Sequence, residues 1–234
     1  MPLVAIDIGH GQDSPNGVPE MSEYEFNQAV VKYLIPLLDL NNICYILTQD
    51  FNSNANELQT RTEIANNSGA DIFVSIHADW NFVNTVRGYW IFHWYNSGQG
   101  KKLAEIWFEN ANKILPIPAR RIVESKPGKW ANFYVIRNTA MPAILIEHGF
   151  MSNIEDLSYL LCENYRKKCA LVLAKSICSY FEIPFKETGK KTLRRVIVDG
   201  KQLGAFETDK YLIDYVNDLI KEKQFPIEIE EIEI

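Results

Sequence analysis

Three apolar segments of the sequence each run into a side chain that could bind a metal ion or transfer a proton. The residues that follow them are His10 after LVAIDIG, His77 after IFVSI and Glu147 after AILI. In parallel α/β sheets, ligands bind beyond the carboxyl ends of the strands, so these side chains would converge if the segments form neighbouring strands. Glu23, at the start of an expected helix after the His10 loop, would lie at the same edge of the sheet. Two imidazoles and a carboxylate are a typical ligand set for a catalytic zinc ion, and a second carboxylate can act as an acid or base.

Ordinary structural roles remain open for these residues, because their spacing alone does not define a metal site. His77 could be a hydrogen-bonded histidine of the core, and Glu23 could be a first-turn carboxylate that the helix dipole favours. His10 stands between two glycines without an apolar neighbour in sequence, which disfavours a structural role. An unpartnered Glu147 would be costly to bury after an apolar run, which favours a nearby metal or a role as a base.

The segments that must position these residues alternate between strand and helix patterns. Apolar runs predict strands over residues 3–8, 43–47, 72–76, 89–94, 133–136 and 143–146. Helical spacing of apolar residues predicts helices from about residue 23, over residues 57–67 and 101–114, and a long one over residues 154–181. This alternation predicts an α/β fold with a largely parallel central sheet flanked by helices.

The helix that carries Glu23 has recognisable start signals. Ser22 precedes Glu25 by three residues, which is the spacing of a capping box. Pro36 lies inside the same helical pattern, where proline removes a backbone donor, and predicts a bend.

A linker and a small second domain follow the long helix. Residues 184–192 combine proline, glycine and charged side chains, which predicts a linker between a catalytic domain over residues 1–183 and a module over residues 193–234. Within the module, Asp199-Gly200 predicts a hairpin, and an amphipathic helix and a last strand after it complete a ββαβ pattern. Such a module is too small for a large core of its own.

The last strand of this module shows a change of phase. Ile227 and Ile229 fall on one face of the expected strand, whereas Ile232 and Ile234 fall on the other. Such a slip predicts a β-bulge or a frayed end, and either would expose apolar side chains. An unpaired strand edge could bury them against a second copy, so we predict a homodimer through the C-terminal module, with a solvated monomeric tail as the alternative.

Composition and charge narrow the class of protein. With 47% hydrophobic and 23% charged residues among 234, the chain can bury a sizeable core. No apolar run reaches the roughly 18 residues of a membrane span, so no membrane insertion is expected. The formal net charge of -6 disfavours a nucleic-acid partner, whose phosphates normally bind a basic surface. The N-terminus lacks a signal-peptide pattern, which predicts synthesis in the cytoplasm.

Four segments around the candidate residues together carry a family resemblance. They are IDIGHGQDSPNG, the Glu-x-x-x-Asn step from Glu23 to Asn27, RTEIANNSGADIFVSIHADW and PAILIEHGFMSN, and in this order they cover most of residues 3–153. On these motifs the sequence resembles the zinc-dependent N-acetylmuramoyl-L-alanine amidase family, whose members include bacterial cell-wall amidases and phage endolysins. Two departures are mild: Gly11-Gln12 replaces the glycine pair that often follows the first histidine, and Asp79 stands where asparagine is frequent.

The resemblance implies a role for each candidate residue. By motif, His10, Glu23 and His77 match the ligands of the family's Zn²⁺ ion. Glu147 matches the catalytic glutamate of its Glu-x-Gly-Phe segment. The nearby carboxylates Glu20 and Glu25 are alternatives to Glu23, and the four-residue offset to Asn27 selects Glu23.

The implied reaction is hydrolysis of the amide bond between the lactyl group of muramic acid and L-alanine in bacterial peptidoglycan. Zinc would polarise the carbonyl and activate water, while Glu147 would take the proton of the water and pass it to the departing amine. The small tail and missing signal peptide resemble a phage endolysin, which is made in the host bacterial cytoplasm and acts on the wall after release. The tail would then bind the cell wall through the basic hairpin residues Arg194, Arg195 and Lys201.

Two other functions remain open from the sequence. Glu23 and Glu147 could be the paired carboxylates of a metal-free glycosidase that cuts the sugar backbone. The chain could also be a non-catalytic wall-binding protein, although chemically competent residues at all four candidate positions disfavour this. Trp80, Asn81 and the aromatic segment at residues 89–95 could line a substrate groove, or could pack in the core.

Overall fold

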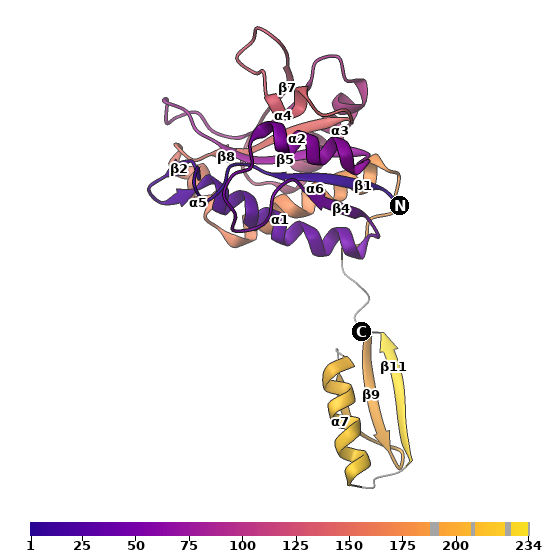
Figure 1. The fold of residues 1–234 in the computed structure, drawn as a ribbon. Coiled ribbons are helices and arrows are strands. Elements are labelled where there is room, and N and C mark those ends of the chain that lie inside the picture. Colours follow the sequence, from indigo (N-terminus) through magenta and orange to yellow (C-terminus); the bar gives the residue numbers. More distant parts are fainter. Residues whose placement is uncertain (188–191, 207–208, 223–225, 234) are drawn as a thin grey trace. The chain divides into compact units, whose positions relative to one another are not determined.

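The computed structural model describes residues 1–187, 192–206, 209–222 and 226–233 (Figure 1). The chain forms two compact units, Met1–Glu187 and Thr188–Ile234. None of the described helices is long and apolar enough to cross a membrane. Every candidate residue of the metal site lies in the larger unit.

A six-stranded sheet forms the centre of the larger unit, in the strand order β4-β1-β5-β8-β6-β7. Its strands are β1 (Leu3–Ile8), β4 (Cys44–Leu47), β5 (Ile72–Asp79), β6 (Tyr89–Trp94), β7 (Ala119–Ser125) and β8 (Ala143–Phe150). β4, β1, β5 and β8 run parallel, whereas β6 is antiparallel to β8 and β7 is parallel to β6. The predicted α/β fold with a largely parallel sheet is confirmed, and β1, β5 and β8 are direct neighbours.

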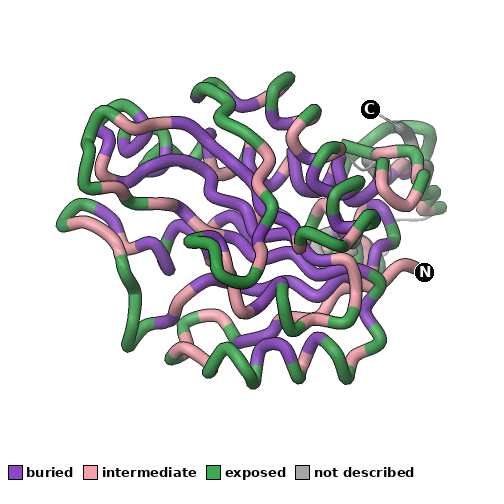
Figure 2. The backbone as a smooth tube through the Cα atoms, turned by 90° about the horizontal axis from the view of Figure 1, so that it is seen from above, coloured by how far each residue is buried: buried purple, intermediate pink, exposed green. Residues whose placement is uncertain are grey.

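Helices cover both faces of this sheet, because successive residues of each strand point to opposite sides. Val4, Ile6 and Ile8 pack with α1, α3 and α6, whereas Ala5 and Phe73 pack on the other face with α2 and α4. Figure 1 shows α1 and α2 on opposite sides of the sheet, and Figure 2 shows buried residues gathered in the interior of the backbone trace, with exposed residues toward its periphery. The helices are α1 (Glu23–Leu40), α2 (Leu58–Ser68), α3 (Gly98–Ile114), α4 (Tyr134–Arg137), α5 (Ile154–Leu160) and α6 (Glu163–Tyr180), and a short pair, β2 (Gly17–Val18) and β3 (Met21–Ser22), precedes α1.

Two elements near the edge of the sheet differ from the prediction. Residues 133–136, predicted as a strand, instead lead into the short helix α4, from which Val135 and Ile136 pack against the sheet. An apolar run this short has no periodicity that separates a strand from a helix. The prediction omits β7 because this edge strand is mostly exposed and carries polar side chains, so it lacks an apolar run.

Among the helices that pack with Val4, Ile6 and Ile8, α1 begins where predicted, whereas the predicted long helix is interrupted. α1 begins at Glu23, where Ser22 Oγ accepts a hydrogen bond from the backbone N–H of Glu25 at 3.3 Å, and it continues through Pro36. The long helix predicted over residues 154–181 is wrong, because α5 ends at Leu160 and α6 begins at Glu163. Apolar spacing continues across this break, so the pattern alone does not reveal it.

The smaller unit has the predicted ββαβ order. Its sheet is antiparallel, with strand order β10-β9-β11. Leu212 and Leu219 of the helix pack against Val196 and Val198 of the central strand and form a small core. The elements are β9 (Thr192–Val198), β10 (Lys201–Phe206), α7 (Asp209–Lys221) and β11 (Ile227–Glu233).

The bulge predicted in the closing strand, β11, is wrong. β11 pairs with β9 without a shift, from Ile227 opposite Val198 to Glu233 opposite Thr192. The irregularity of this sheet lies instead in β10, between Gln202 and Gly204. An unbroken ladder of backbone hydrogen bonds therefore sets the register of β11 despite the change of phase in its side chains. The predicted frayed end concerns Ile234, which lies outside the described residues.

Candidate metal centre

The loop after β1 holds His10 in an unusual conformation. The N–H of Gly9 donates to the carbonyl of Ile76 at 3.2 Å, so the chain stays beside β5 past the end of β1. His10 then adopts a φ of 66°, in the left-handed region that few residues other than glycine occupy. Its carbonyl oxygen accepts hydrogen bonds from Arg61 Nη2 at 2.8 Å and Gln49 Nε2 at 2.5 Å, which stabilise this conformation.

Glu23 is the first residue of α1, and its side chain is held from several directions. Asn16 Nδ2 donates to Glu23 Oε2 at 2.6 Å, and the backbone N–H of Ala78 donates to Oε1 at 3.2 Å. One turn later on the same helix face, Asn27 Nδ2 donates to the carbonyl of Gly9 at 3.1 Å. The Glu-x-x-x-Asn step therefore ties α1 to the loop that carries His10.

The structure brings His10, Glu23 and His77 to one point. His10 Nε2 lies 3.0 Å from Glu23 Oε2, and His77 Nδ1 lies 2.8 Å from Glu23 Oε1. One potential ligand atom from each residue lies within 4.8 Å of the other two. Within the described ranges, no other trio of histidine, cysteine, aspartate or glutamate side chains gathers in this way.

The charge of Glu23 suits a metal ligand. Burial raises the pKa of Glu23, but hydrogen bonds and positive charge from His10 and His77 outweigh this effect and lower its pKa to about 2. Glu23 therefore remains a carboxylate at neutral pH. The competing carboxylates Glu20 and Glu25 are exposed, and Glu25 forms an ion pair with α6 at 2.6 Å.

His77 fits into space that only a glycine leaves free. A Cβ atom at position 9 would lie 2.3 Å from His77 Cε1, so the imidazole ring rests directly against Gly9. On the ring's far side from Glu23, Nε2 lies 3.1 Å from the hydroxyl of Ser75. The first glycine of the Gly9-His10-Gly11 motif is therefore required by the packing of a residue from a different strand.

Glu147 lies beside these three residues, on the neighbouring strand. It pairs in register with His77, from β8 to β5. Its side chain is buried, and Oε2 has no hydrogen-bond partner among the described residues. Burial raises the pKa of Glu147 well above its usual range, and the negative charges of Asp79 and Glu23 raise it further. A buried carboxyl with such a shift beside a cleft is typical of a catalytic acid or base.

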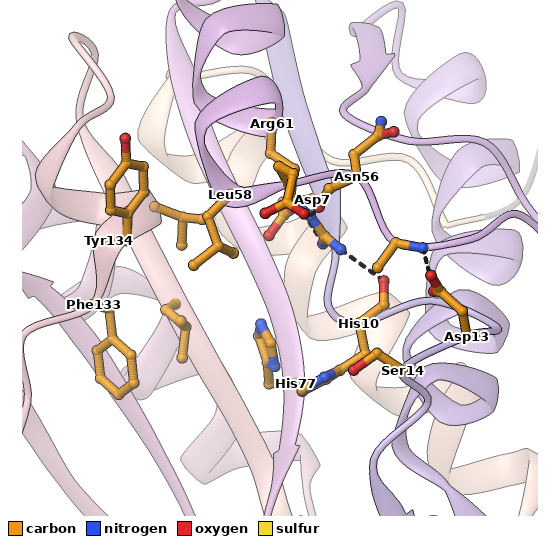
Figure 3. A pocket seen from close by; sticks show the side chains of 14 residues that line it. Asp7, His10, Asp13, Ser14, Asn56, Leu58, Arg61, His77, Phe133 and Tyr134 are labelled. Carbon is orange, nitrogen blue, oxygen red and sulfur yellow. Dashed lines mark hydrogen bonds and ion pairs between the residues drawn. The ribbon is translucent and has the colours of Figure 1, made fainter.

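Two cavities meet at the imidazole rings. One, of about 600 Å³, is lined by the three candidate ligands together with Glu147 and Trp80. The other, of about 370 Å³, extends from the same rings between Leu58 and Tyr134 on one side and Asp13 on the other (Figure 3). His10 and His77 therefore lie where the two cavities meet. The residues that line both cavities are His10, His77, Phe133 and Leu145.

The aromatic residues divide between the core and the cavities. Tyr89 and Phe92 of β6 are buried and belong to the apolar clusters, so this strand serves packing rather than the groove. Trp80 is 42% exposed and lines the larger cavity. Its ring meets that of Phe82 edge to face, with the centroids 4.5 Å apart.

Sequence reasoning missed the buried polar residues behind the site. Asp7, in the middle of β1, is 1% exposed, and the side chains of Thr48, Arg61 and Ser75 all contact it. A charged residue inside the apolar run LVAIDI was the available signal, because a buried carboxylate requires partners. Those partners come from distant parts of the chain and could not be named in advance.

A known protein family matches most of the larger unit. The model of the N-acetylmuramoyl-L-alanine amidase family matches residues 4–179, which include all four candidate residues. This match spans well over half of the 234 residues. The chain belongs to this family. The resemblance noted on the motifs is confirmed, and the C-terminal module lies beyond the matched range.

This amidase-family chain is similar to several known proteins and solved structures. The N-acetylmuramoyl-L-alanine amidase LytC of Bacillus subtilis (strain 168) is 30% identical over 182 residues, which are 76% of this chain and 35% of LytC. The endolysin of Bacillus phage SPP1 is 25% identical over 189 residues, which are 80% of this chain and 69% of the endolysin. The catalytic domain of CwlV, an N-acetylmuramoyl-L-alanine amidase from Bacillus (Paenibacillus) polymyxa var. colistinus, has a TM-score of 0.72 at 28% identity and covers 79% of this chain and 100% of its own. The chain thus spans about a third of the length of LytC.

The donor set of this amidase-family site fits zinc. Two imidazole nitrogens and one carboxylate oxygen are the protein ligands of many catalytic zinc ions, which keep a further position open for water or substrate. Glu23 is already ionised, and the larger cavity opens beside all three donors. The same cavity contains Glu147, so a group that can exchange a proton lies next to the open side of the site.

Proposed function

We propose that this chain is a zinc-dependent N-acetylmuramoyl-L-alanine amidase that hydrolyses the bond between the muramoyl lactyl group and L-alanine of peptidoglycan. Family membership supports this proposal. The convergence of His10, Glu23 and His77 beside the buried Glu147 carboxyl is the observation that carries it. In this proposal His10, Glu23 and His77 are the zinc ligands, and Glu147 is the catalytic acid and base.

The chain supplies orientation and proton transfer for this reaction. Zinc, when held by the three ligands, would polarise the amide carbonyl and make water acidic enough to attack near neutral pH. Glu147 takes a proton from the attacking water as the C–O bond forms, and it gives that proton to the alanine nitrogen as the C–N bond breaks. The products are a lactyl carboxylate and a peptide with a free amino group.

The metal-free glycosidase has less support from the geometry. A glycosidase needs two carboxyl groups that flank the glycosidic bond to be cut. Glu23 instead lies between His10 and His77, and it also accepts hydrogen bonds from Asn16 and the backbone of Ala78. A carboxylate enclosed in this way is better suited to holding a metal ion than to attacking a sugar.

Product analysis tests the proposed reaction. Purified peptidoglycan treated with the protein should release peptides with new L-alanine amino groups, identified by mass spectrometry. EDTA should abolish this release and added zinc should restore it, because the reaction depends on the ion held by His10, Glu23 and His77. Release of new reducing ends in the presence of EDTA would support the glycosidase instead. Binding to walls without any products would support a non-catalytic protein.

We also propose that the C-terminal module binds the cell wall and that the chain acts as a phage endolysin, with a homodimer formed through the module. Similarity to the endolysin of phage SPP1 supports the lytic role. The hairpin of the module carries Arg195 and Lys201, whose positive charges suit an anionic wall polymer. Ile213, Ile220 and Ile229 are exposed large apolar side chains that a second copy could cover.

Removal of the module should separate catalysis from wall binding. A chain that ends at Glu187 should fold and cleave soluble muropeptides, because all four site residues precede this point. It also keeps both hydrogen bonds between Asn41 and the backbone of Lys186, at 2.9 and 2.7 Å. Clearing of intact walls, followed by turbidity, should weaken because the shortened chain has lost its proposed wall contacts.

Light scattering on the same two proteins tests the dimer. The full chain should have twice the monomer mass, whereas the shortened chain should be monomeric. Equal monomer masses would exclude a dimer through the module. A shortened chain that is unfolded or inert on soluble muropeptides would show that the module completes the catalytic unit.

A further inference from the structure

A buried polar network lies directly behind the candidate metal centre and has no part in the proposed chemistry. Its centre is the carboxylate of Asp7, which is 1% exposed. Asp7 Oδ2 accepts a hydrogen bond from Ser75 Oγ at 2.6 Å. Asp7 Oδ1 accepts from Thr48 Oγ1 at 2.6 Å and from Arg61 Nη1 at 3.1 Å. Ser75 and Thr48 are both fully buried, so their hydroxyl groups have fixed partners rather than water.

The chemistry of these groups determines where their protons lie. As a carboxylate paired with the Arg61 guanidinium, Asp7 can only accept hydrogen bonds. The single hydroxyl proton of Ser75 therefore points to Asp7, which leaves the oxygen lone pairs of Ser75 as acceptors. His77 Nε2 lies 3.1 Å from this oxygen, so the nitrogen must carry a proton to form a hydrogen bond with it. The opposite nitrogen, Nδ1, faces Glu23 and is then the ring atom that can bind a metal ion once it has no proton.

The same contact selects one of two orientations of the imidazole ring. The ring rests against Gly9, where no side chain could fit. A half-turn about χ2 keeps the plane of the ring and exchanges its nitrogen and carbon positions. After such a turn, carbon atoms would face both Ser75 and Glu23, and neither contact could form. A hydrogen bond from Nε2 to Ser75 therefore favours the orientation in which Nδ1 faces the metal centre.

We propose that Ser75, oriented by Asp7, is a positioning residue that fixes both the tautomer and the ring orientation of His77, so that Nδ1 binds zinc. This inference rests on the zinc site proposed above. Metal-bound histidines generally donate their second N–H to a fixed acceptor, which orients the ring. Here the acceptor is a serine hydroxyl that is itself held by a carboxylate one strand away, on β1.

A matched pair of variants separates positioning from general stability. Ser75→Ala and Thr48→Val each remove one buried hydroxyl that donates to Asp7, but only Ser75 also contacts His77. Zinc affinity of the full chain should be measured by competition with a chromophoric chelator. Ser75→Ala should weaken zinc binding about 10- to 100-fold, the usual effect of losing a partner of a metal-bound histidine, whereas Thr48→Val should retain the original affinity. Thermal unfolding of the two zinc-free proteins should change to a similar extent.

Nitrogen NMR of the unaltered protein gives a second test that does not depend on any variant folding. In the zinc-loaded protein, His77 should show a protonated Nε2 and a metal-bound Nδ1. A protonated Nδ1 would overturn the proposal, as would equal zinc affinities for Ser75→Ala and Thr48→Val. If the unaltered protein binds no zinc at all, the proposed metal site itself fails. That outcome is distinct from tight zinc binding that is indifferent to Ser75.

Discussion

Replacement of Glu147 by glutamine should lower the rate of amide hydrolysis by about 10²- to 10⁴-fold, the usual contribution of a general acid and base. Glutamine has nearly the same shape but cannot accept the proton of the attacking water. Zinc should stay bound, because Glu147 is not among the three proposed ligands. Turnover of a soluble muropeptide and the zinc content of the same preparation, determined by elemental mass spectrometry, measure the two effects together.

The control for this prediction is a carboxylate with no part in the site. Glu25→Gln changes the same functional group on an exposed position of α1, where the ion pair with Arg166 is its principal contact. It should leave both turnover and zinc content unchanged, since an exposed ion pair contributes little to stability. Full activity in Glu147→Gln would refute the proposed role of Glu147. Loss of zinc from that variant would instead place Glu147 among the ligands.

Replacement of either histidine of the metal centre by alanine should abolish hydrolysis and remove most of the bound zinc. His10→Ala and His77→Ala each leave Glu23 and one imidazole, and two protein ligands hold a catalytic zinc ion poorly. The loss of affinity should exceed the roughly 10- to 100-fold effect typical of removing a residue that only supports a ligand. Dialysis against a zinc buffer followed by elemental mass spectrometry measures the metal, and muropeptide turnover measures the activity.

Thermal unfolding provides a readout of zinc binding that does not depend on catalysis. A ligand that binds only the folded protein raises its unfolding temperature, so zinc should stabilise the unaltered chain and not the two variants. His93→Gln is the matched control, because His93 is a buried histidine of the same sheet whose Nδ1 contacts the carbonyl of Trp94 at 3.0 Å. This control should keep its response to zinc. Zinc-dependent stabilisation in His10→Ala equal to that of the unaltered chain would exclude His10 as a ligand.

Local sequence patterns were sufficient to predict the elements that carry the site. The apolar runs before His10, His77 and Glu147 are the buried strands β1, β5 and β8. The capping signal of Ser22 marks the first turn of α1, where Glu23 lies. These predictions succeeded because strand burial and helix capping depend on residues close together in the chain.

The same patterns failed where tertiary contacts override local preference. Residues 134–136 belong to the helix α4 because the second core cluster offers a place for Val135 and Ile136, which a short apolar run does not specify. The phase change in the closing strand predicts a bulge, yet its pairing with β9 keeps the register of β11 continuous. In both cases a partner distant in sequence determines the local structure.

The sequence by itself determined which residues could do chemistry and which strands and helix carry them, although β5 and β8 continue past His77 and Glu147 to Asp79 and Phe150. Only the tertiary structure decided that β1, β5 and β8 are neighbours, and thus that His77 and Glu147 lie side by side. It also supplied the partners of Asp7, because Thr48 is 41 residues away and Ser75 is 68 residues away in sequence. Hydrogen bonds over such separations leave no periodic pattern in the chain, since they form only when the sheet has assembled and excluded water from around the carboxylate.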